Sequence, residues 1–238
     1  MELMGWFLLM LSDKFTQFYR YKITYTLSII ISLFYLYISF VTGNFIDTTT
    51  KELAINGAIF APFVIDGEWY RVLISMFLHG GLTHFALNTL SLILVGRAFE
   101  TYFSPSQYIS LYFLTGIAGG VISMYFHPLS VIVGASGAIF GIFGGLVGFF
   151  VANKEALGNQ FREIIKNVGL ILVFNLGIGL VFPDIDMSAH ITGLIIGFIA
   201  GFLSIDKRYF WAFNIFLAIL IYLFAILVLT KDLFLTLG

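Results

Sequence analysis

The sequence predicts an all-α polytopic membrane protein. Of its 238 residues, 60% are hydrophobic and only 11% are charged, and the mean hydropathy is +1.00. A soluble domain of this length has too little interior to bury so much apolar surface, so we expect the solvent to be a bilayer. Several apolar runs approach or exceed the ~20 residues that a helix needs to cross a hydrocarbon core of ~30 Å.

Hydropathy predicts seven spanning helices. The second is the weakest because Thr83, His84 and Asn88 interrupt it early. The segment 43–76 is too polar to span and too aromatic for a plain linker, so we expect it to lie in the outer interface. The predicted spans are 23–42, 77–99, 107–126, 132–153, 164–182, 187–204 and 209–230.

The positive charges predict the orientation of the chain. With a cytoplasmic N-terminus, nine of the 12 lysines and arginines face the cytosol, and only Lys51, Arg71 and Lys231 lie outside. This bias is typical of plasma-membrane proteins with a cytoplasmic N-terminus, and seven crossings then place the C-terminus outside. We expect a cytoplasmic or interfacial segment, a six-helix core containing the loop 43–76, and a seventh helix with a short outer tail. These parts are 1–22, 23–204 and 205–238.

Four polar residues inside the predicted spans are candidates for a functional site. Ionisable and polar groups at membrane depth are costly, which makes each one a functional hypothesis. Counted from the cytoplasmic charges at ~1.5 Å per residue, His84, Ser136 and His190 lie at similar heights of roughly 20 to 27 Å. Asn88 follows His84 by one helical turn, so the two share a face. We therefore expect one cavity that opens to the outside.

Glycines at a spacing of four predict that the fourth and sixth spans pack closely. His190 lies three residues before one of these stripes, so packing brings it to Ser136 at the outer helix ends. A histidine within hydrogen-bond reach activates a serine hydroxyl as a nucleophile. The two stripes are Gly137, Gly141 and Gly145, and Gly193, Gly197 and Gly201.

The glycines beside the serine predict a sharp turn into a helix. Gly134 and Gly137 flank Ser136, and the first N–H groups of a helix are available to stabilise an oxyanion. Asp184 and Asp186 fall in an outer connector, so the sequence favours a Ser–His dyad over a triad. No acidic residue or thiolate completes a metal site, and cysteine is absent. No cofactor is expected, and the net charge of −1 argues against nucleic acid as a partner.

Three stretches carry these residues. They are "GEWYRVLISMFLHGGLTHFALNTL" (67–90), "GASG" (134–137) and "SAHITGLIIG" (188–197). The first looks like a WR element followed by an HxxxN helix, and the others match GxSG and AHxxGxxxG. In this order, over about 43–204, the chain resembles the rhomboid family of intramembrane serine proteases. The seventh helix is similar to the additional C-terminal helix of the 6+1 type.

The resemblance implies a serine endopeptidase that cleaves single-span membrane proteins near the outer end of their helix. Ser136 would be the nucleophile and His190 the general base. The Ser136 backbone N–H, His84 and Asn88 would form the oxyanion hole. Phe140 would stack on the base.

The resemblance also implies supporting roles away from the reacting atoms. Arg71 would anchor the first loop together with Glu100, and His79 would be structural or retain water. One departure is that Tyr70 splits the family's tryptophan–arginine pair, which is a common variation.

Other interpretations stay open at this point. The glycines are packing residues in either case, and His84 and Asn88 are alternatively polar contacts between helices. The main alternative is an inactive rhomboid-like protein that binds membrane helices; such proteins typically lose the serine or the histidine, and this chain keeps both. A small transporter would carry ionisable residues at the midplane or paired broken helices, and the sequence has neither pattern. The sequence does not specify an oligomeric state.

Overall fold

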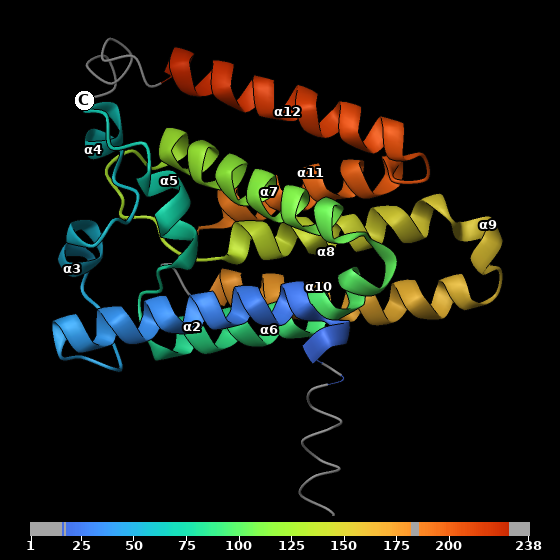
Figure 1. Cartoon of the computed structure of the whole chain (residues 1–238), viewed down its shortest axis with the longest axis horizontal. Coiled ribbons are helices and arrows are strands. Elements are labelled where there is room, and N and C mark those ends of the chain that lie inside the picture. Colours follow the sequence, from blue (N-terminus) through green and yellow to red (C-terminus); the bar gives the residue numbers. More distant parts are fainter. Residues whose placement is uncertain (1–15, 17, 182–185, 229–238) are drawn as a thin grey trace, which may run out of the picture.

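The computed structural model describes residue 16, residues 18–181 and residues 186–228. The described chain is a bundle of long helices with a cluster of short helices at one end (Figure 1). The long helices are α2 (Lys22–Thr42), α6 (Leu82–Tyr102), α7 (Pro105–Phe126), α8 (Ser136–Ala152), α10 (Gln160–Val181), α11 (Met187–Leu203) and α12 (Lys207–Val228). The short ones are α3 (Thr50–Ile55), α4 (Ala61–Ile65), α5 (Arg71–Ile74), the 3₁₀ helix η1 (Ser75–Phe77) and α9 (Lys154–Leu157).

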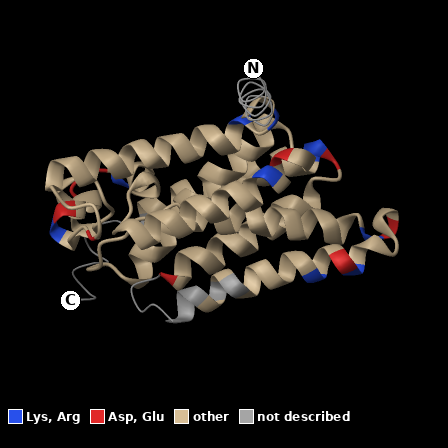
Figure 2. Cartoon of the chain, turned by 90° about the horizontal axis from the view of Figure 1, so that it is seen from below, with Lys and Arg blue, Asp and Glu red and all other residues tan. Residues whose placement is uncertain are grey.

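The helix lengths confirm the all-α, multi-pass class. Within the described residues, four helices are long and apolar enough to cross a membrane, namely α2, α6, α7 and most of α12, while α8 and α11 are apolar but have 17 residues each. At 1.5 Å per residue, 17 residues span only ~25 Å. Charged residues gather toward the two ends of the bundle (Figure 2). The segment predicted for 1–22 lies mostly outside the described residues, as does the tail after residue 228.

Two helices begin later than hydropathy predicts, and both differences concern the site. The second span begins at Leu82 rather than at 77, because η1 and an extended stretch precede it. The fourth begins at Ser136 rather than at 132. There the backbone of Ile132 pairs with Ile59 through two hydrogen bonds of 2.9 and 3.1 Å, so this stretch is extended rather than helical. Ser136 is therefore in the first turn of α8.

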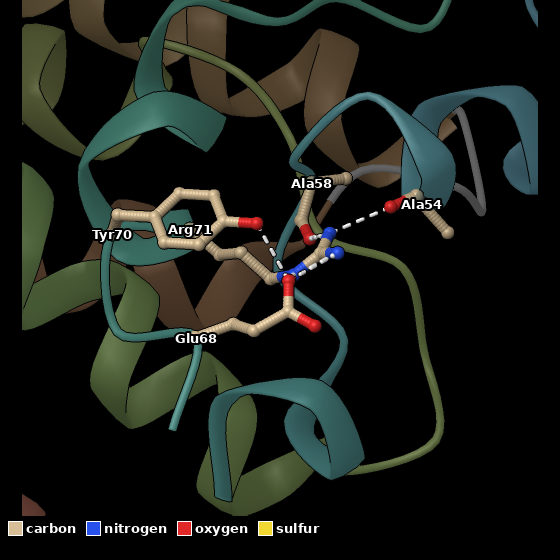
Figure 3. A network of polar contacts seen from close by, with 5 residues as sticks. All are labelled: Ala54, Ala58, Glu68, Tyr70 and Arg71. Carbon is tan, nitrogen blue, oxygen red and sulfur yellow. Dashed lines mark hydrogen bonds and ion pairs between the residues drawn. The ribbon is translucent and has the colours of Figure 1, made fainter. Parts of the chain in front are cut away.

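Arg71 organises the loop between α2 and α6 (Figure 3). Its buried guanidinium donates hydrogen bonds to the carbonyls of Ala54 and Ala58, at 2.6 and 3.0 Å, and to the carboxylate of Glu68 at 2.9 Å. Tyr70 donates its hydroxyl to the same carboxylate at 2.6 Å. These bonds, from Tyr70 first and then Arg71, lower the pKa of Glu68 below its ordinary value. One cation thus ties α3, the following turn and α5 together.

The expected pairing of Arg71 with Glu100 is wrong. Glu100 lies near the end of α6, 18 residues after its start at Leu82, which is ~27 Å along the helix axis. It accepts hydrogen bonds from the backbone N–H groups of Ile23 and Thr24, at 2.8 and 3.0 Å. Glu100 therefore caps α2, since an anion stabilises the unpaired N–H groups at a helix N-terminus.

The structure confirms that the two glycine stripes face each other. A Cβ on Gly193 would lie 2.1 Å from the carbonyl oxygen of Gly137, and one on Gly197 would lie 1.9 Å from that of Gly141. The same holds one turn on, where a Cβ on Gly201 would lie 2.0 Å from the oxygen of Gly145. The backbones of α8 and α11 are thus in direct contact. We call this contact the glycine seam.

Candidate active site

Seven of the predicted site residues border one cavity of about 1070 Å³. The cavity lies beside the extended stretch 130–134 and the N-terminal ends of α8 and α11, and α6, α7 and α10 also contribute to its wall. The structure therefore brings the three predicted polar helices together. Of the predicted site residues, its lining contains His84, Asn88, Gly134, Ser136, Gly137, Phe140 and His190.

Ser136 opens α8 at a helix start that no side chain caps. The residue before it is Ala135, which has no polar side chain to bond the first N–H groups. Gly134 precedes it with φ of 118°, a conformation that favours glycine, and its N–H bonds to the carbonyl of Ser75 at 2.9 Å. This is the sharp turn that the glycines predict. It leaves backbone donors and the positive end of the helix dipole beside the serine hydroxyl.

The ring of His84 lies against this turn. A Cβ on Gly134 would lie 2.8 Å from Nε2 of His84 and 3.9 Å from Oγ of Ser136. The absent side chain is therefore what leaves room for the imidazole next to the serine. Both the φ value of Gly134 and the closeness of the His84 ring therefore require a glycine at this position.

Asn88 and His79 lie around His84. The amide nitrogen of Asn88 donates to the carbonyl oxygen of His84 at 3.0 Å, which uses one of its two N–H donors. The ring of His79 packs edge-on against that of His84, with centroids 5.0 Å apart. His79 is buried, and its Nδ1 lies 3.2 Å from the carbonyl oxygen of Phe77. The ring of His79 thus packs against the imidazole of His84, while Asn88 bonds to the backbone of the same residue.

His190 lies in the first turns of α11, at the N-terminal end of the glycine seam. Its side chain is buried, and its ring stacks on that of Phe140 with centroids 4.3 Å apart and planes 21° apart. The next residue back, Ala189, meets Gly137, where a Cβ would lie 3.5 Å from the Ala189 carbonyl oxygen. Ser136 and His190 thus flank a direct contact between two helices. In the described part of the chain, no hydrogen bond joins the side chains of Ser136 and His190. Catalytic hydrogen bonds are often long in a free enzyme and shorten only when substrate binds.

Sequence reasoning missed two further groups in the cavity wall. Asp186, which the sequence places in the connector before the sixth span, is the N-cap of α11 and lines the cavity, so a carboxylate borders the site. Its position four residues before His190 was the available signal. Ser91 of α6 and Asn175 of α10 also line the cavity, joined by a hydrogen bond of 2.8 Å. Among the described residues, no group of three His, Cys, Asp or Glu side chains is placed to hold a metal ion.

Comparison with known proteins gives one family and several relatives. The model of the "Rhomboid domain" matches residues 66–207, more than half of the chain. "Rhomboid protease GluP" of Bacillus subtilis (strain 168) is 39% identical over 155 residues, which are 65% of this chain and 30% of that protein. "RHOMBOID-like protein 4" of Arabidopsis thaliana is 37% identical over 68% of this chain and 41% of its own length. "Putative rhomboid protease YdcA" of Bacillus subtilis is 33% identical over 61% of this chain and 72% of its own length. The match thus spans less than half of the first two relatives.

Proposed function

Because the chain belongs to the rhomboid family, we propose that it is an intramembrane serine endopeptidase that uses a Ser136–His190 dyad. The family is one of intramembrane proteases, and two of the bacterial relatives are named as proteases. The observation that carries the proposal is the glycine seam, which holds the first turns of α8 and α11 side by side at the cavity.

In the proposed reaction, His190 takes the proton of the Ser136 hydroxyl as Oγ attacks the scissile carbonyl carbon. The resulting tetrahedral intermediate collapses when His190 protonates the leaving amine. Water, deprotonated by His190, then attacks the acyl-enzyme, and His190 returns this proton to Oγ of Ser136 as the ester bond breaks and the acid product leaves, as in the Ser–His half of the serine protease triad. Phe140 supports this exchange by holding the plane of the imidazole.

The negative oxygen of the intermediate is assigned to three donors. The backbone N–H of Ser136 lies at the uncapped start of α8, where the helix dipole favours negative charge. His84 is held beside Gly134, and Asn88 keeps one N–H free after bonding the carbonyl of His84. Donors fixed in advance need no rearrangement as the charge develops, which is the basis of their catalytic effect.

We assign the protein to the plasma membrane with its N-terminus in the cytosol and its site open to the outer side. Nine of the 12 lysines and arginines support this orientation. The substrates assigned to it are single-span membrane proteins, cut near the outer end of the spanning helix. The short α8 and α11 support a site below the outer surface, because each helix spans only ~25 Å.

The reaction is tested with the full-length protein in liposomes and a fluorogenic single-span substrate. We expect Ser136→Ala and His190→Ala each to lower kcat by about 10⁴-fold or more without loss of the folded state. Asn88→Ala is expected to lower kcat by about 10²-fold, the typical effect of one oxyanion donor. Cleavage by purified Ser136→Ala would refute the assignment.

A serine-directed fluorophosphonate separates an enzyme from an inactive helix-binding protein. We expect the probe to label the wild type and not Ser136→Ala. Ser130→Ala is the matched control, because Ser130 lines the same cavity but lies before the turn at Gly134 and not at the start of α8. Absence of Ser136-dependent labelling would favour the inactive alternative.

The orientation is tested with single cysteines, since the chain has none of its own. A membrane-impermeant maleimide should label Lys51→Cys in intact cells and Lys154→Cys only after lysis. The reverse pattern would overturn the proposed orientation.

A further inference from the structure

Asp186 presents a carboxylate oxygen that the folded chain leaves without a hydrogen bond. As the N-cap of α11, its Oδ1 accepts the backbone N–H of Ser188 at 2.9 Å and also the Ser188 hydroxyl. Its other oxygen, Oδ2, is buried and has no hydrogen-bond partner among the described residues. Unpaired buried polar atoms are uncommon in native proteins, so this one calls for an explanation.

His190 carries a second unpaired atom one helical turn away. Its Nδ1 is buried and without a hydrogen-bond partner in the described part of the chain. Residues four apart in a helix share a face, and helical side chains lean toward the N-terminus, which here is the direction of Asp186. Both residues line the same cavity. One unpaired atom thus belongs to a carboxylate, which carries a negative charge, and the other to an imidazole, which becomes positive when it is protonated.

We propose that Asp186 is a positioning residue that orients His190 and stabilises the imidazolium formed when His190 takes the serine proton. This inference rests on the proposed function. A buried imidazolium is costly without a compensating charge, and a carboxylate one turn away supplies it in a medium of low dielectric constant. The cap bonds to Ser188 hold the carboxylate in place, so it needs no rearrangement during the reaction.

Among the residues that the structure describes, the other titratable groups around the cavity are three histidines, which carry no negative charge, and Asp47, which belongs to a different segment of the wall. His84 and His127 also line it, and His79 packs on His84. His127 has its Nε2 3.9 Å from Oδ1 of Asp186 and is about half exposed. Asp47 lines the cavity too, but it belongs to the loop paired with Gly81 at the start of α6.

The test measures kcat and kcat/KM against pH for the full-length wild type and Asp186→Asn in liposomes with a single-span substrate. Asparagine is as good an N-cap as aspartate, so this change removes the charge and keeps the cap. We expect kcat on the pH plateau to fall about tenfold, because the imidazolium loses its counter-charge. We also expect the acidic limb of kcat/KM to move to lower pH, because His190 is harder to protonate without the neighbouring carboxylate.

Asp206→Asn is the matched control. Asp206 also precedes a helix and accepts the N–H of the residue two places on, Arg208, at 2.8 Å, but it lies at the start of α12 and does not line the cavity. We expect this variant to keep the kcat and the pH profile of the wild type. Asp186→Ser provides a second uncharged cap and should reproduce the Asp186→Asn result if that variant folds poorly.

Two results would overturn the inference alone. One is a wild-type kcat and pH profile in folded Asp186→Asn or Asp186→Ser. The other is a lowered kcat with an unmoved acidic limb, which indicates a structural role for the cap. A wild type without Ser136-dependent turnover would instead refute the proposed function, so the two failures are distinguishable.

Discussion

The glycine seam and the contact between α6 and α10 border the same cavity but are built differently. At the seam, Cβ atoms on Gly193 and Gly197 would lie 2.1 and 1.9 Å from carbonyl oxygens of α8. In α10, by contrast, a Cβ on Gly169 would have nothing within 4 Å. Among the described residues, α6 and α10 are joined by a hydrogen bond from Ser91 to Asn175. One wall of the cavity is thus placed by backbone contact, which tolerates no added atom, and the other by side chains.

The largest expected effect is at the seam. Gly197→Ala puts a methyl group at 1.9 Å from the carbonyl oxygen of Gly141, so α8 and α11 must separate. Overpacking of this kind typically destabilises by about 1–3 kcal/mol, and here the obstacle is backbone. We expect thermal unfolding in detergent at a lower temperature and loss of substrate cleavage. If Gly197→Ala kept the unfolding temperature and the cleavage activity of the wild type, α8 and α11 would not be held in rigid contact at the seam.

The next largest effect is at the turn before the seam, where Gly134 meets His84. Gly134→Ala combines a strained φ of 118° with a Cβ 2.8 Å from Nε2 of His84. Gly67→Ala is a matched control, because Gly67 has φ of 110° and open space around its Cβ position. Both should lose about 1–3 kcal/mol from backbone strain, and only Gly134→Ala should lower kcat, by about tenfold or more. Equal kcat values in the two variants would contradict the contact with His84.

A smaller effect is expected across the α6–α10 contact. A double-mutant cycle with Ser91→Ala and Asn175→Ala isolates their interaction. Hydrogen bonds between membrane helices average about 0.6 kcal/mol in such cycles, so we expect a coupling energy of that size from unfolding in detergent. A coupling above about 2 kcal/mol would mean that this wall is held as firmly as the seam.

The smallest effect is expected at Gly169. Gly169→Ala adds a methyl group into open space within α10, and alanine favours the helix by roughly 0.5–1 kcal/mol over glycine. The melting temperature should stay level or rise slightly, and cleavage should be unchanged. A clear loss of stability would mean that α10 packs as closely as α11.

Much of the site could be predicted from the sequence, because it depends on patterns between residues that are close together in the chain. The spacing of Gly193, Gly197 and Gly201 predicts a close helix contact whatever surrounds it, and His190 lies in register with that stripe. The turn at Gly134 was predicted from the glycines beside Ser136. Hydropathy, however, predicted that the fourth span begins at 132, whereas α8 begins at Ser136. An apolar stretch has the same composition whether it is helical or extended, so hydropathy does not distinguish the two.

Contacts between distant segments were where the sequence-based expectations failed. Glu100 was expected to bind Arg71, but it caps α2, because α6 carries it away from the loop that holds Arg71. Asp186 does lie just before the sixth span, as predicted, but the sequence did not show that it caps α11 and lines the cavity. The sequence shows which charged and polar side chains need a partner, but it does not show which partner the fold places beside each of them.

Residue order alone establishes that this chain is an α-helical membrane protein, because a bilayer requires every backbone N–H and C=O to be paired within the chain and apolar runs of this length do so as helices. It also establishes the glycine stripes. The folded chain settles where α6 and α8 begin, which carboxylate caps α11 at the cavity and which wall is rigid, because these depend on pairings between segments far apart, such as Ile59 with Ile132.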